Sequence, residues 1–322
     1  MKIIVAGASG FIGGRLCNFL ADQGFEVIAL YNRNVPKDDN WKQKVSTLVK
    51  TDLSCKAETD ALARFDAPVV INLVSLDQAK SNSDPETVCN VNVLPSWNLL
   101  NSLSGKGLKK FIYLSTIHVY GNALRGVITE SSTVQPANTY GLTHLLSENI
   151  IGMFSRSREI DCSVIRLSNG FGAPQFMQNK CWDLVINNLC LSAWQKQTLI
   201  IKSDGTPLRD FVPMVDVLTG IEQIIRAANP DKMQTINFSR KETISILAAA
   251  MLVKNAYEKR YGRPVTIFIN GDQPVTSYNQ SPGDTYLIDN TWFLQLMENH
   301  PLHDLTFGIN EIFNLLESQQ GS

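Results

Sequence analysis

Residues 1–14 read MKIIVAGASGFIGG, a short apolar run that breaks into glycines at every third position. The segment RLCNFL follows with helical spacing, so the pattern predicts a buried strand, a tight turn and a helix. In such a turn Gly7 permits the bend, Gly10 lets the backbone approach a pyrophosphate, and Gly13 lets the helix pack on the strand. The helix N-terminus would offer unpaired N–H groups to phosphates. The stretch therefore predicts a dinucleotide site, against the alternative of a glycine-rich turn without a ligand.

The composition is that of an ordinary folded protein. The chain has 322 residues, 44% of them hydrophobic and 18% charged, with a formal net charge of -1. This length suits one large α/β unit or two domains. The small net charge gives no field that attracts nucleic acid or an acidic membrane surface, and no apolar run approaches the roughly 20 residues that span a bilayer. With no leader-like segment before the first strand, we expect a cytoplasmic protein without nucleic-acid or membrane partners.

The cysteines and histidines do not form a metal-binding pattern. The cysteines are scattered and include no C-x-x-C pair, so they are interpreted as reduced thiols rather than a disulfide framework or a zinc site. His300 and His303 do not make a metal site by themselves. We therefore predict no bound metal and interpret these two histidines, together with His118, as structural or surface residues.

Apolar runs alternate with helical patterns along most of the chain. Strands are predicted at 25–30, 45–49, 68–74, 110–115 and 160–167, with a last strand at 235–238. Helical patterns occur at 90–100 and 138–154. Continuous apolar strands alternating with helices are typical of a parallel sheet covered on both faces. The predicted fold class is therefore α/β, a Rossmann-type doubly wound parallel sheet.

The character of the sequence changes after the strand at 160–167. A helix is predicted at 182–194 and a strand at 198–201, followed by a turn and the apolar stretch 208–217. We interpret this part as a smaller C-terminal α+β region laid over the carboxyl edge of the sheet. The expected domains are residues 1–168 with a return of 208–240, which bind the dinucleotide, and residues 169–322, which mainly bind the substrate.

The end of the second strand bears on the identity of the dinucleotide. An NAD site usually places an acid there to hydrogen-bond the adenosine ribose, whereas an arginine suits the 2′-phosphate of NADP. Residues 31–34 read YNRN and contain Arg33 but no acid, so the sequence favours NADP over NAD. Asp52 closes the third strand, where it would either read an adenine amino group or serve as a solvated turn residue.

Two pairs of side chains are candidates for catalysis. Ser115 and Thr116 end the strand at 110–115, and ligands in open α/β sheets bind beyond the carboxyl ends of the strands. Tyr140 and His144 are four residues apart and share one face of the helix at 138–154. From spacing alone, Tyr140 fits a structural role better than a catalytic one.

Together these segments resemble the extended short-chain dehydrogenase/reductase group, the nucleotide-sugar epimerase/dehydratase family. The resemblance runs from residue 1 to about residue 240 and rests on several motifs in order. These motifs are GASGFIG at 7–13, Asp52-Leu53, Asn90-Val91-Asn92, Ser115-Thr116, Val119-Tyr120-Gly121, Tyr140-Gly141, Arg166 with Asn169 and Gly172, and Arg209-Asp210-Phe211.

The resemblance implies a mechanism in which Tyr140 exchanges a proton with a sugar oxygen while nicotinamide exchanges hydride with the same carbon. It implies that Thr116 hydrogen-bonds that oxygen, and that Asn169 and Arg209 hold the diphosphate of a nucleoside diphosphate sugar. An ion pair of Arg209 with Asp210 or Asp216 is the structural alternative. The residues implied to hold the cofactor are Gly7, Gly10, Phe11, Ile12, Gly13, Arg33, Asp52, Leu53, Leu73, Ser75, Asn92, Ser115, Tyr140 and His144.

The chain departs from the family pattern at three places. The family normally has lysine where this chain has His144, and that charge lowers the tyrosine pKa from about 10 by roughly 2 to 3. A histidine is mostly neutral at pH 7, so it could donate a hydrogen bond to the ribose but would supply little charge. Ile117 and His118 stand where 4,6-dehydratases carry acids, which argues against water elimination. Residues 281–284 resemble a late family motif that has lost its arginine.

Three functions remain open from the sequence. An NADP(H)-dependent 4-ketoreductase acting on a nucleoside diphosphate 4-keto-6-deoxyhexose is slightly favoured, because Arg33 suits an exchangeable NADPH. A nucleotide-sugar 4-epimerase, also working at C4 of a nucleoside diphosphate hexose, is nearly as well supported. A catalytically quiet NADP-binding sensor or scaffold is motivated by His144 and the missing arginine. The resemblance further implies a homodimer, formed through the helices after Asn92 and Tyr140, and a role in polysaccharide biosynthesis.

Overall fold

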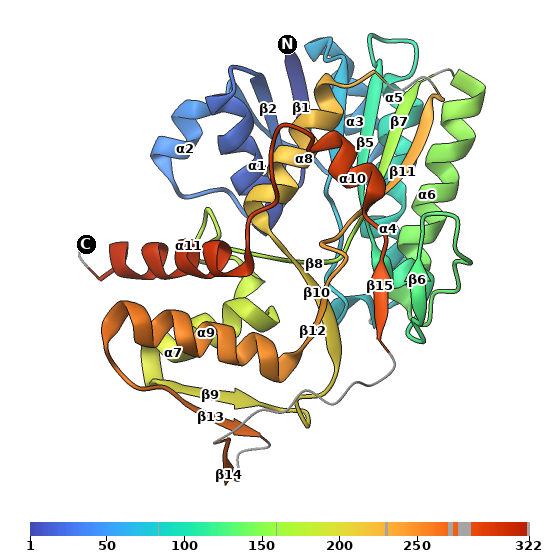
Figure 1. Cartoon of the computed structure of the whole chain (residues 1–322). Coiled ribbons are helices and arrows are strands. Elements are labelled where there is room, and N and C mark those ends of the chain that lie inside the picture. The colour runs from blue at the N-terminus through green and yellow to red at the C-terminus, as the bar shows by residue number, and fades with distance from the viewer. Residues whose placement is uncertain (83, 159, 229–230, 270–272, 276–284, 321–322) are drawn as a thin grey trace. The chain divides into compact units, whose positions relative to one another are not determined.

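The chain forms two compact units, shown in Figure 1. The computed structural model describes residues 1–82, 84–158, 160–228, 231–269, 273–275 and 285–320. Unit 1 consists of residues 1–124, 130–167 and 220–238, and unit 2 of residues 125–129, 168–219 and 239–322. Each unit has its own sheets and its own hydrophobic core.

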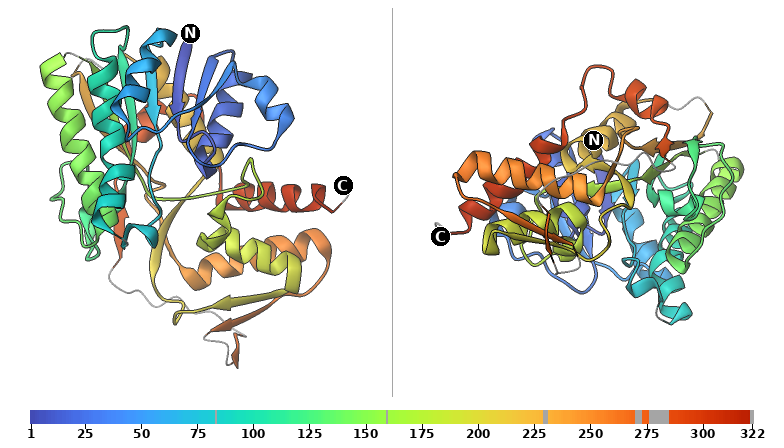
Figure 2. Two further views of the ribbon diagram at one scale, coloured as in Figure 1. Left: turned by 180° about the vertical axis from the view of Figure 1, so that it is seen from behind. Right: turned by 60° about the horizontal axis from the view of Figure 1, so that its bottom comes forward.

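Unit 1 is built on a seven-stranded sheet in the order β11-β7-β5-β4-β1-β2-β3, with all neighbouring strands parallel. Its strands are β1 (Lys2–Ala6), β2 (Glu26–Tyr31), β3 (Thr47–Lys50), β4 (Val69–Asn72), β5 (Lys110–Thr116), β7 (Asp161–Leu167) and β11 (Met233–Phe238). Figure 2 shows helices on both faces of this sheet. The doubly wound α/β fold predicted from the sequence is therefore confirmed.

The strand order reverses at β1, because the chain first adds β2 and β3 on one side and then returns to add β4 on the other. Such a switch point opens a crevice beyond the carboxyl ends of the two central strands. Strands β1, β4 and β7 are almost entirely buried, as expected of a sheet covered on both faces. The fold thus directs the ends of β1 and β4 to the place where a ligand would bind.

The helices of unit 1 follow the predicted pattern with one correction. They are α1 (Phe11–Asp22), α2 (Asp39–Lys44), α3 (Lys56–Asp60), α4 (Pro85–Asn92), α5 (Leu94–Leu103), α6 (Thr139–Arg158) and the part of α8 (Met214–Arg226) from residue 220, with the short 3-10 turns η1 (Ala61–Phe65), η2 (Lys80–Asn82) and η3 (Ile117–Tyr120). The helical pattern predicted at 90–100 is confirmed except at Val93, where it is interrupted. It is divided at Val93 into α4 and α5, because Pro95 has no N–H to continue the ladder of α4.

Unit 2 contains three small sheets, with strand orders β12-β10-β8, β14-β13-β9 and β15-β6. Their strands are β6 (Gly126–Ile128), β8 (Asn169–Phe171), β9 (Thr198–Ile201), β10 (Leu208–Pro213), β12 (Thr243–Ser245), β13 (Thr266–Ile269), β14 (Gln273–Pro274) and β15 (Tyr286–Ile288). The predicted strand at 198–201 is confirmed as β9. The apolar stretch at 208–217 divides into strand β10 and the start of helix α8.

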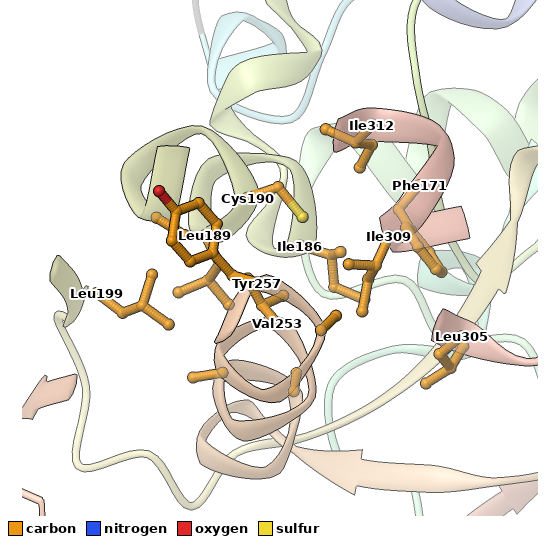
Figure 3. Close-up of a cluster of buried hydrophobic side chains, with 14 of the residues drawn as sticks. Phe171, Ile186, Leu189, Cys190, Leu199, Val253, Tyr257, Leu305, Ile309 and Ile312 are labelled. Atoms are coloured by element: carbon orange, nitrogen blue, oxygen red, sulfur yellow. The ribbon is translucent and has the colours of Figure 1, made fainter. Parts of the chain in front are cut away.

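Three helices enclose the core of unit 2. The helical elements of this unit are η4 (Lys180–Asp183), α7 (Val185–Lys196), α9 (Ile246–Tyr261), α10 (Thr291–Leu296) and α11 (Leu305–Ser318). Figure 3 shows side chains of α7, α9 and α11 converging, among them Ile186, Val253 and Ile309. A Cβ at Gly308 would lie only 2.8 Å from the Phe171 ring, so α11 packs directly on β8. This packing supports the strands that carry Asn169 and Arg209.

Candidate active site

The glycine turn between β1 and α1 is as tight as the sequence predicts. Gly7 has a φ of +86°, a conformation that only glycine adopts without strain. The Gly10 N–H donates to the Gly7 carbonyl at 2.9 Å, and a Cβ at Gly13 would lie 2.1 Å from the same oxygen. No side chain larger than hydrogen fits at Gly13, so the first turn of α1 lies directly against the loop.

The N-terminus of α1 suits a phosphate group. The helix begins at Phe11 after Gly10, which has no side chain with which to cap the first N–H groups. The first turn continues with Ile12 and Gly13 and contains no acid that would repel an anion. Unpaired N–H groups and the positive end of the helix dipole therefore meet any ligand here. This part of the structure fits a dinucleotide pyrophosphate.

The residues predicted to bind the adenosine end of the cofactor differ in whether their polar groups already have partners within the described part of the protein. Arg33 is exposed and forms no ion pair with a described residue, so its guanidinium is available to a 2′-phosphate. The Asp52 carboxylate accepts from the Ser54 N–H at 3.0 Å and from its hydroxyl at 2.7 Å. Asp52 therefore closes its own turn. The carbonyl of Leu53 is held by the amide of Asn98 at 2.9 Å, and the contacts of Asp52 and Leu53 with adenine remain a prediction.

The loop after β4 lies against the glycine turn. The Leu73 carbonyl carbon would be 3.3 Å from a Cβ at Gly7, and the Leu73 N–H donates to the Ala6 carbonyl at 3.1 Å. Asn92 is fully buried, accepts from the Leu76 N–H at 2.8 Å and donates to the Thr143 hydroxyl at 2.9 Å. Asn92 therefore ties this loop to α6, and the direct cofactor contact predicted for it stays untested.

Ser115 belongs to a buried ionic network rather than to an open surface. Its hydroxyl donates to Glu148, whose carboxylate pairs with the Arg166 guanidinium at 2.7 Å. Arg166 also donates to the Tyr120 hydroxyl at 2.9 Å. A buried carboxylate requires such partners. Glu148 was not predicted from the sequence, although it lies one helical turn after His144 and therefore on the same face of α6.

Thr116 and Tyr140 come together at the end of β5. The Thr116 hydroxyl oxygen accepts from the His118 N–H at 3.2 Å, and hydrogen bonding between Thr116 and Tyr140 favours the ionised phenol. Burial outweighs this effect and, with the nearby negative charge of Asp77, raises the pKa of Tyr140 to about 12. Tyr140 is therefore a phenol at neutral pH. Its position is set by Asn138, which caps the start of α6 through the Gly141 N–H at 2.8 Å.

His144 is the centre of a hydrogen-bond chain. Its Nδ1 lies 2.8 Å from the Tyr113 hydroxyl and its Nε2 lies 3.0 Å from the Ser75 hydroxyl. Ser75 donates its own proton to the Leu76 carbonyl at 2.8 Å, so it accepts from His144. The imidazole therefore carries its proton on Nε2 and accepts from Tyr113 on Nδ1. Both ring nitrogens are already bonded within the protein, which leaves neither for a ribose hydroxyl in this conformation.

His144 also brings no charge to Tyr140. Its side chain is 2% exposed, and burial, reinforced by the nearby His118, lowers the pKa of His144 to about 3. The Tyr140 ring makes edge contacts with both imidazoles, at centroid distances of 4.6 Å to His144 and 5.6 Å to His118. His144 thus stands beside the tyrosine as a neutral ring.

The predicted diphosphate-binding residues lie on neighbouring strands of unit 2. The Asn169 amide donates to the Asp210 carbonyl at 2.8 Å, and β8 pairs with β10. Arg209 is exposed and donates to the Leu208 carbonyl at 2.7 Å, while forming no ion pair with a described residue. The Asp210 carboxylate instead accepts from the backbone of Arg240 at 3.0 Å. The ion-pair alternative for Arg209 is therefore not what the structure shows.

Other features of the described residues do not add to this site. Residues 281–284, with their missing arginine, lie outside the part of the chain that the structure describes. A shallow surface hollow is lined by Thr291, Leu294, Gln295 and Glu298 and contains no predicted site residue. Within the described ranges, no group of three or more metal-ligating side chains occurs, and no helix has the length and apolar character needed to cross a bilayer.

The buried neutral histidine predicts a specific pH dependence of stability. Unfolded His144 titrates near pH 6.5, whereas the folded protein takes up this proton only near pH 3. The stabilisation of the folded state by neutral His144 is therefore complete above about pH 6.5. It is lost as the pH falls, by up to about 1.4 kcal/mol per pH unit, because the unfolded chain takes up the proton first. In urea unfolding, the free energy of unfolding of wild type should fall more steeply below about pH 6.5 than that of His144→Gln. The exposed His300→Gln variant is the control, and equal slopes for wild type and His144→Gln would refute the neutral imidazole.

Comparisons with known proteins agree with this geometry. The sequence model of the NAD dependent epimerase/dehydratase family matches residues 3–238. A protein of Bacillus subtilis (strain 168) named an uncharacterized UDP-glucose epimerase is 26% identical over 337 aligned residues and is covered completely, as is this chain. A UDP-glucose 4-epimerase of Mycolicibacterium smegmatis is 28% identical over 236 residues, with 71% of this chain and 74% of the relative covered.

Solved structures with the same fold include a UDP-glucose 4-epimerase from Thermotoga maritima with UDP-glucose. It superimposes with a TM-score of 0.82 at 21% identity and covers 99% of this chain and 100% of its own. The protein MoeE5, solved with UDP-glucuronic acid and NAD, gives a TM-score of 0.80 at 22% identity with the same coverage. These likenesses concern the fold. Because the family match extends over most of the sequence, the chain belongs to the NAD dependent epimerase/dehydratase family and is an enzyme.

Proposed function

We propose that the protein is an NAD(P)H-dependent 4-ketoreductase of nucleoside diphosphate sugars. The observation that carries this proposal is the protonated Tyr140 beside a neutral His144. A ketone that receives hydride needs a proton at its oxygen, and a phenol can donate one. The reverse reaction needs the phenolate, which at pH 7 amounts to roughly one part in 10⁵ for a pKa of about 12. At neutral pH Tyr140 is therefore in the protonation state from which reduction of a keto group starts.

In the proposed reduction, different residues of unit 1 bind the cofactor, donate the proton and hold the reacting oxygen. When bound, the reduced nicotinamide cofactor supplies hydride to the sugar carbon. Tyr140 donates its proton to the oxygen on that carbon, and the Thr116 hydroxyl holds the same oxygen by a hydrogen bond. His144 orients Ser75 through its Nε2 proton and keeps the loop after β4 in place. The glycine turn and the N-terminus of α1 hold the pyrophosphate of the cofactor.

The substrate proposal rests on Arg209 and Asn169. Arg209 has an exposed guanidinium and no carboxylate partner among the described residues, so it suits a diphosphate, which it can bind through two parallel hydrogen bonds. Asn169 stands on the strand next to it. Structural neighbours have been solved with UDP-glucose and UDP-glucuronic acid, so we propose a UDP-sugar as the substrate class.

The second candidate is a 4-epimerase, which the names of the relatives favour. UDP-glucose 4-epimerases occur among them from Mycolicibacterium smegmatis and Bacillus subtilis. An epimerase first oxidises C4, so Tyr140 would have to accept a proton before it gives one back. The neutral His144 makes that first step slow.

Product analysis with NADPH separates these functions. With a UDP-4-keto-hexose, the ketoreductase proposal predicts that NADPH is consumed in proportion to the alcohol formed. Tyr140→Phe should lower kcat roughly 10²- to 10⁴-fold, because the general acid is lost. Tyr257→Phe, in the core of unit 2, is the matched control and should keep full turnover.

Other results of this assay would indicate a different function or mechanism. Interconversion of UDP-glucose and UDP-galactose without net cofactor consumption would establish the epimerase and contradict the reductase. Tight NADPH binding with no turnover of any UDP-sugar would support the quiet sensor. Full activity of Tyr140→Phe would remove the tyrosine from the mechanism.

NADP is proposed as the cofactor because Arg33 is exposed at the end of β2, although solved neighbours contain NAD. Arg33→Ala should weaken NADPH binding about tenfold to hundredfold, the value of a lost charged hydrogen bond, and leave NADH binding nearly unchanged. Isothermal titration of both cofactors measures this, with Lys37→Ala in the same loop as the control. If wild type binds NADH as tightly as NADPH, the role given to Arg33 is wrong.

A homodimer is proposed through α5 and α6. Leu142, Leu146 and Met153 share the exposed face of α6, and Trp97 on α5 is exposed beside them with its ring 5.5 Å from that of Phe154. Such an apolar face is typical of a protein interface. Leu146→Glu should therefore yield monomers in analytical ultracentrifugation, whereas Leu294→Glu, equally exposed on α10, should not. A monomeric wild type would contradict the dimer.

A further inference from the structure

We propose that Glu148 and Arg166, the buried ion pair of unit 1, are positioning residues for Thr116. This role rests on the proposed function, in which the Thr116 hydroxyl holds the reacting oxygen. Neither charged side chain contacts that oxygen in the proposed reaction. They act through both ends of the short segment 115–120, which contains Thr116.

The side chain of Thr116 is oriented by η3, the 3-10 turn that follows it. Thr116 is the N-cap of this turn, and its hydroxyl oxygen accepts from the His118 N–H at 3.2 Å. A capping side chain takes its orientation from the N–H group that it accepts from. The ladder between β5 and β7 ends at Thr116, so the sheet does not hold η3 in place. The position of η3 therefore decides where the Thr116 hydroxyl lies.

Tyr120, the last residue of η3, ties this turn to Arg166. Its hydroxyl accepts from the Arg166 guanidinium at 2.9 Å and donates to the side-chain oxygen of Asn237 at 2.7 Å. The guanidinium also lies over the Tyr120 ring, 4.8 Å from the ring centroid. The same guanidinium nitrogen donates to the Glu130 carbonyl at 3.1 Å. Arg166 thus holds the chain at the end of η3 and again ten residues later, at Glu130.

Glu148 fixes Arg166 and also holds the residue before Thr116. Its carboxylate accepts from Nη2 of Arg166 at 2.7 Å and from Nε at 3.2 Å, and two such bonds set the plane of the guanidinium. Oxygen Oε1 of the same carboxylate accepts from the Ser115 hydroxyl. Ser115 is paired with Arg166 across the ladder between β5 and β7. Thr116 therefore lies between two points, Ser115 and η3, that are bound to one ion pair.

The value of this ion pair is position rather than stability. Both partners are buried, and replacing a buried ion pair by apolar residues of similar volume is often neutral for stability. A hydroxyl that holds a reacting oxygen, in contrast, depends on its exact place, because a misplacement of about 1 Å can lower a rate about hundredfold. Loss of a contact to the pair should therefore be seen first as rotation of the Thr116 side chain.

The first test measures the Thr116 side chain by NMR and needs no substrate. In protein labelled with carbon-13 at threonine methyl groups and with nitrogen-15 in the backbone, vicinal couplings report χ1, and the Thr116 signal is assigned by its loss in Thr116→Val. Wild type should show a single staggered χ1. Tyr120→Phe keeps the ring and removes the hydroxyl, so it should average Thr116 over several rotamers. Tyr257→Phe, another buried tyrosine, is the matched control and should leave Thr116 unchanged.

Ser115→Ala removes the other contact and should have the same effect on Thr116. Its control is Ser102→Ala, at a buried serine of α5. Glu148→Asp, which keeps the charge but shortens the side chain, is the third variant. Circular dichroism checks that each variant folds, and since the variants cut different contacts, one folded variant is enough. A single, unchanged rotamer of Thr116 in every folded variant would overturn the proposal.

The second test asks whether the effect on the reaction passes through Thr116. With NADPH and a UDP-4-keto-hexose, Tyr120→Phe should lower kcat about tenfold to hundredfold at an unchanged KM. In the Thr116→Val background the same change should have no further effect, because no hydroxyl is left to be positioned. Equal fold-losses in both backgrounds would contradict the proposal. A wild type without turnover would contradict the proposed function alone, since the NMR test decides the positioning role without substrate.

Discussion

The hydrogen-bond chain from Tyr113 through His144 to Ser75 is the constraint on which the site depends. It joins β5, α6 and the loop after β4, and it uses both nitrogens of the imidazole. Burial then keeps the ring neutral. Lysine at this position would carry a charge to the tyrosine and a donor to the cofactor, whereas His144 instead organises the loop. Because histidine replaces lysine at this position, Tyr140 has no cation from residue 144 to lower its pKa.

The remaining site residues fall into two groups. Asn92 and Ser115 have their polar atoms bonded within unit 1 and hold the framework. Arg33 and Arg209 are exposed cations without a carboxylate partner among the described residues, as expected of groups that meet phosphates. In the proposed reaction, these arginines would bind the anionic cofactor and the anionic substrate, and the neutral hydroxyls of Thr116 and Tyr140 would contact the reacting oxygen. The proposal of a ketoreductase rests on the protonated phenol of Tyr140 in that setting.

The sheet could be predicted from the sequence because buried parallel strands are continuous apolar runs. The glycine turn could be predicted because a Cβ at Gly13 does not fit, which makes the glycine spacing strict. The division of the predicted helix at Val93 was missed, since helical spacing continues across the break. The partners of His144 could not be foreseen, because Tyr113 and Ser75 are 31 and 69 residues away in sequence. The contact of His118 with Tyr140 could not be foreseen for the same reason, because it exists only when η3 packs on α6.

The neutral state of His144, with its proton on Nε2, is the property on which the proposed chemistry depends most directly. Nitrogen-15 NMR of the histidine rings measures this directly, with the His144 signals assigned by their loss in His144→Gln. We expect one protonated and one unprotonated ring nitrogen at pH 7, with no titration down to about pH 5, because the pKa of His144 is about 3. Two protonated nitrogens at pH 7, the mark of an imidazolium, would contradict it.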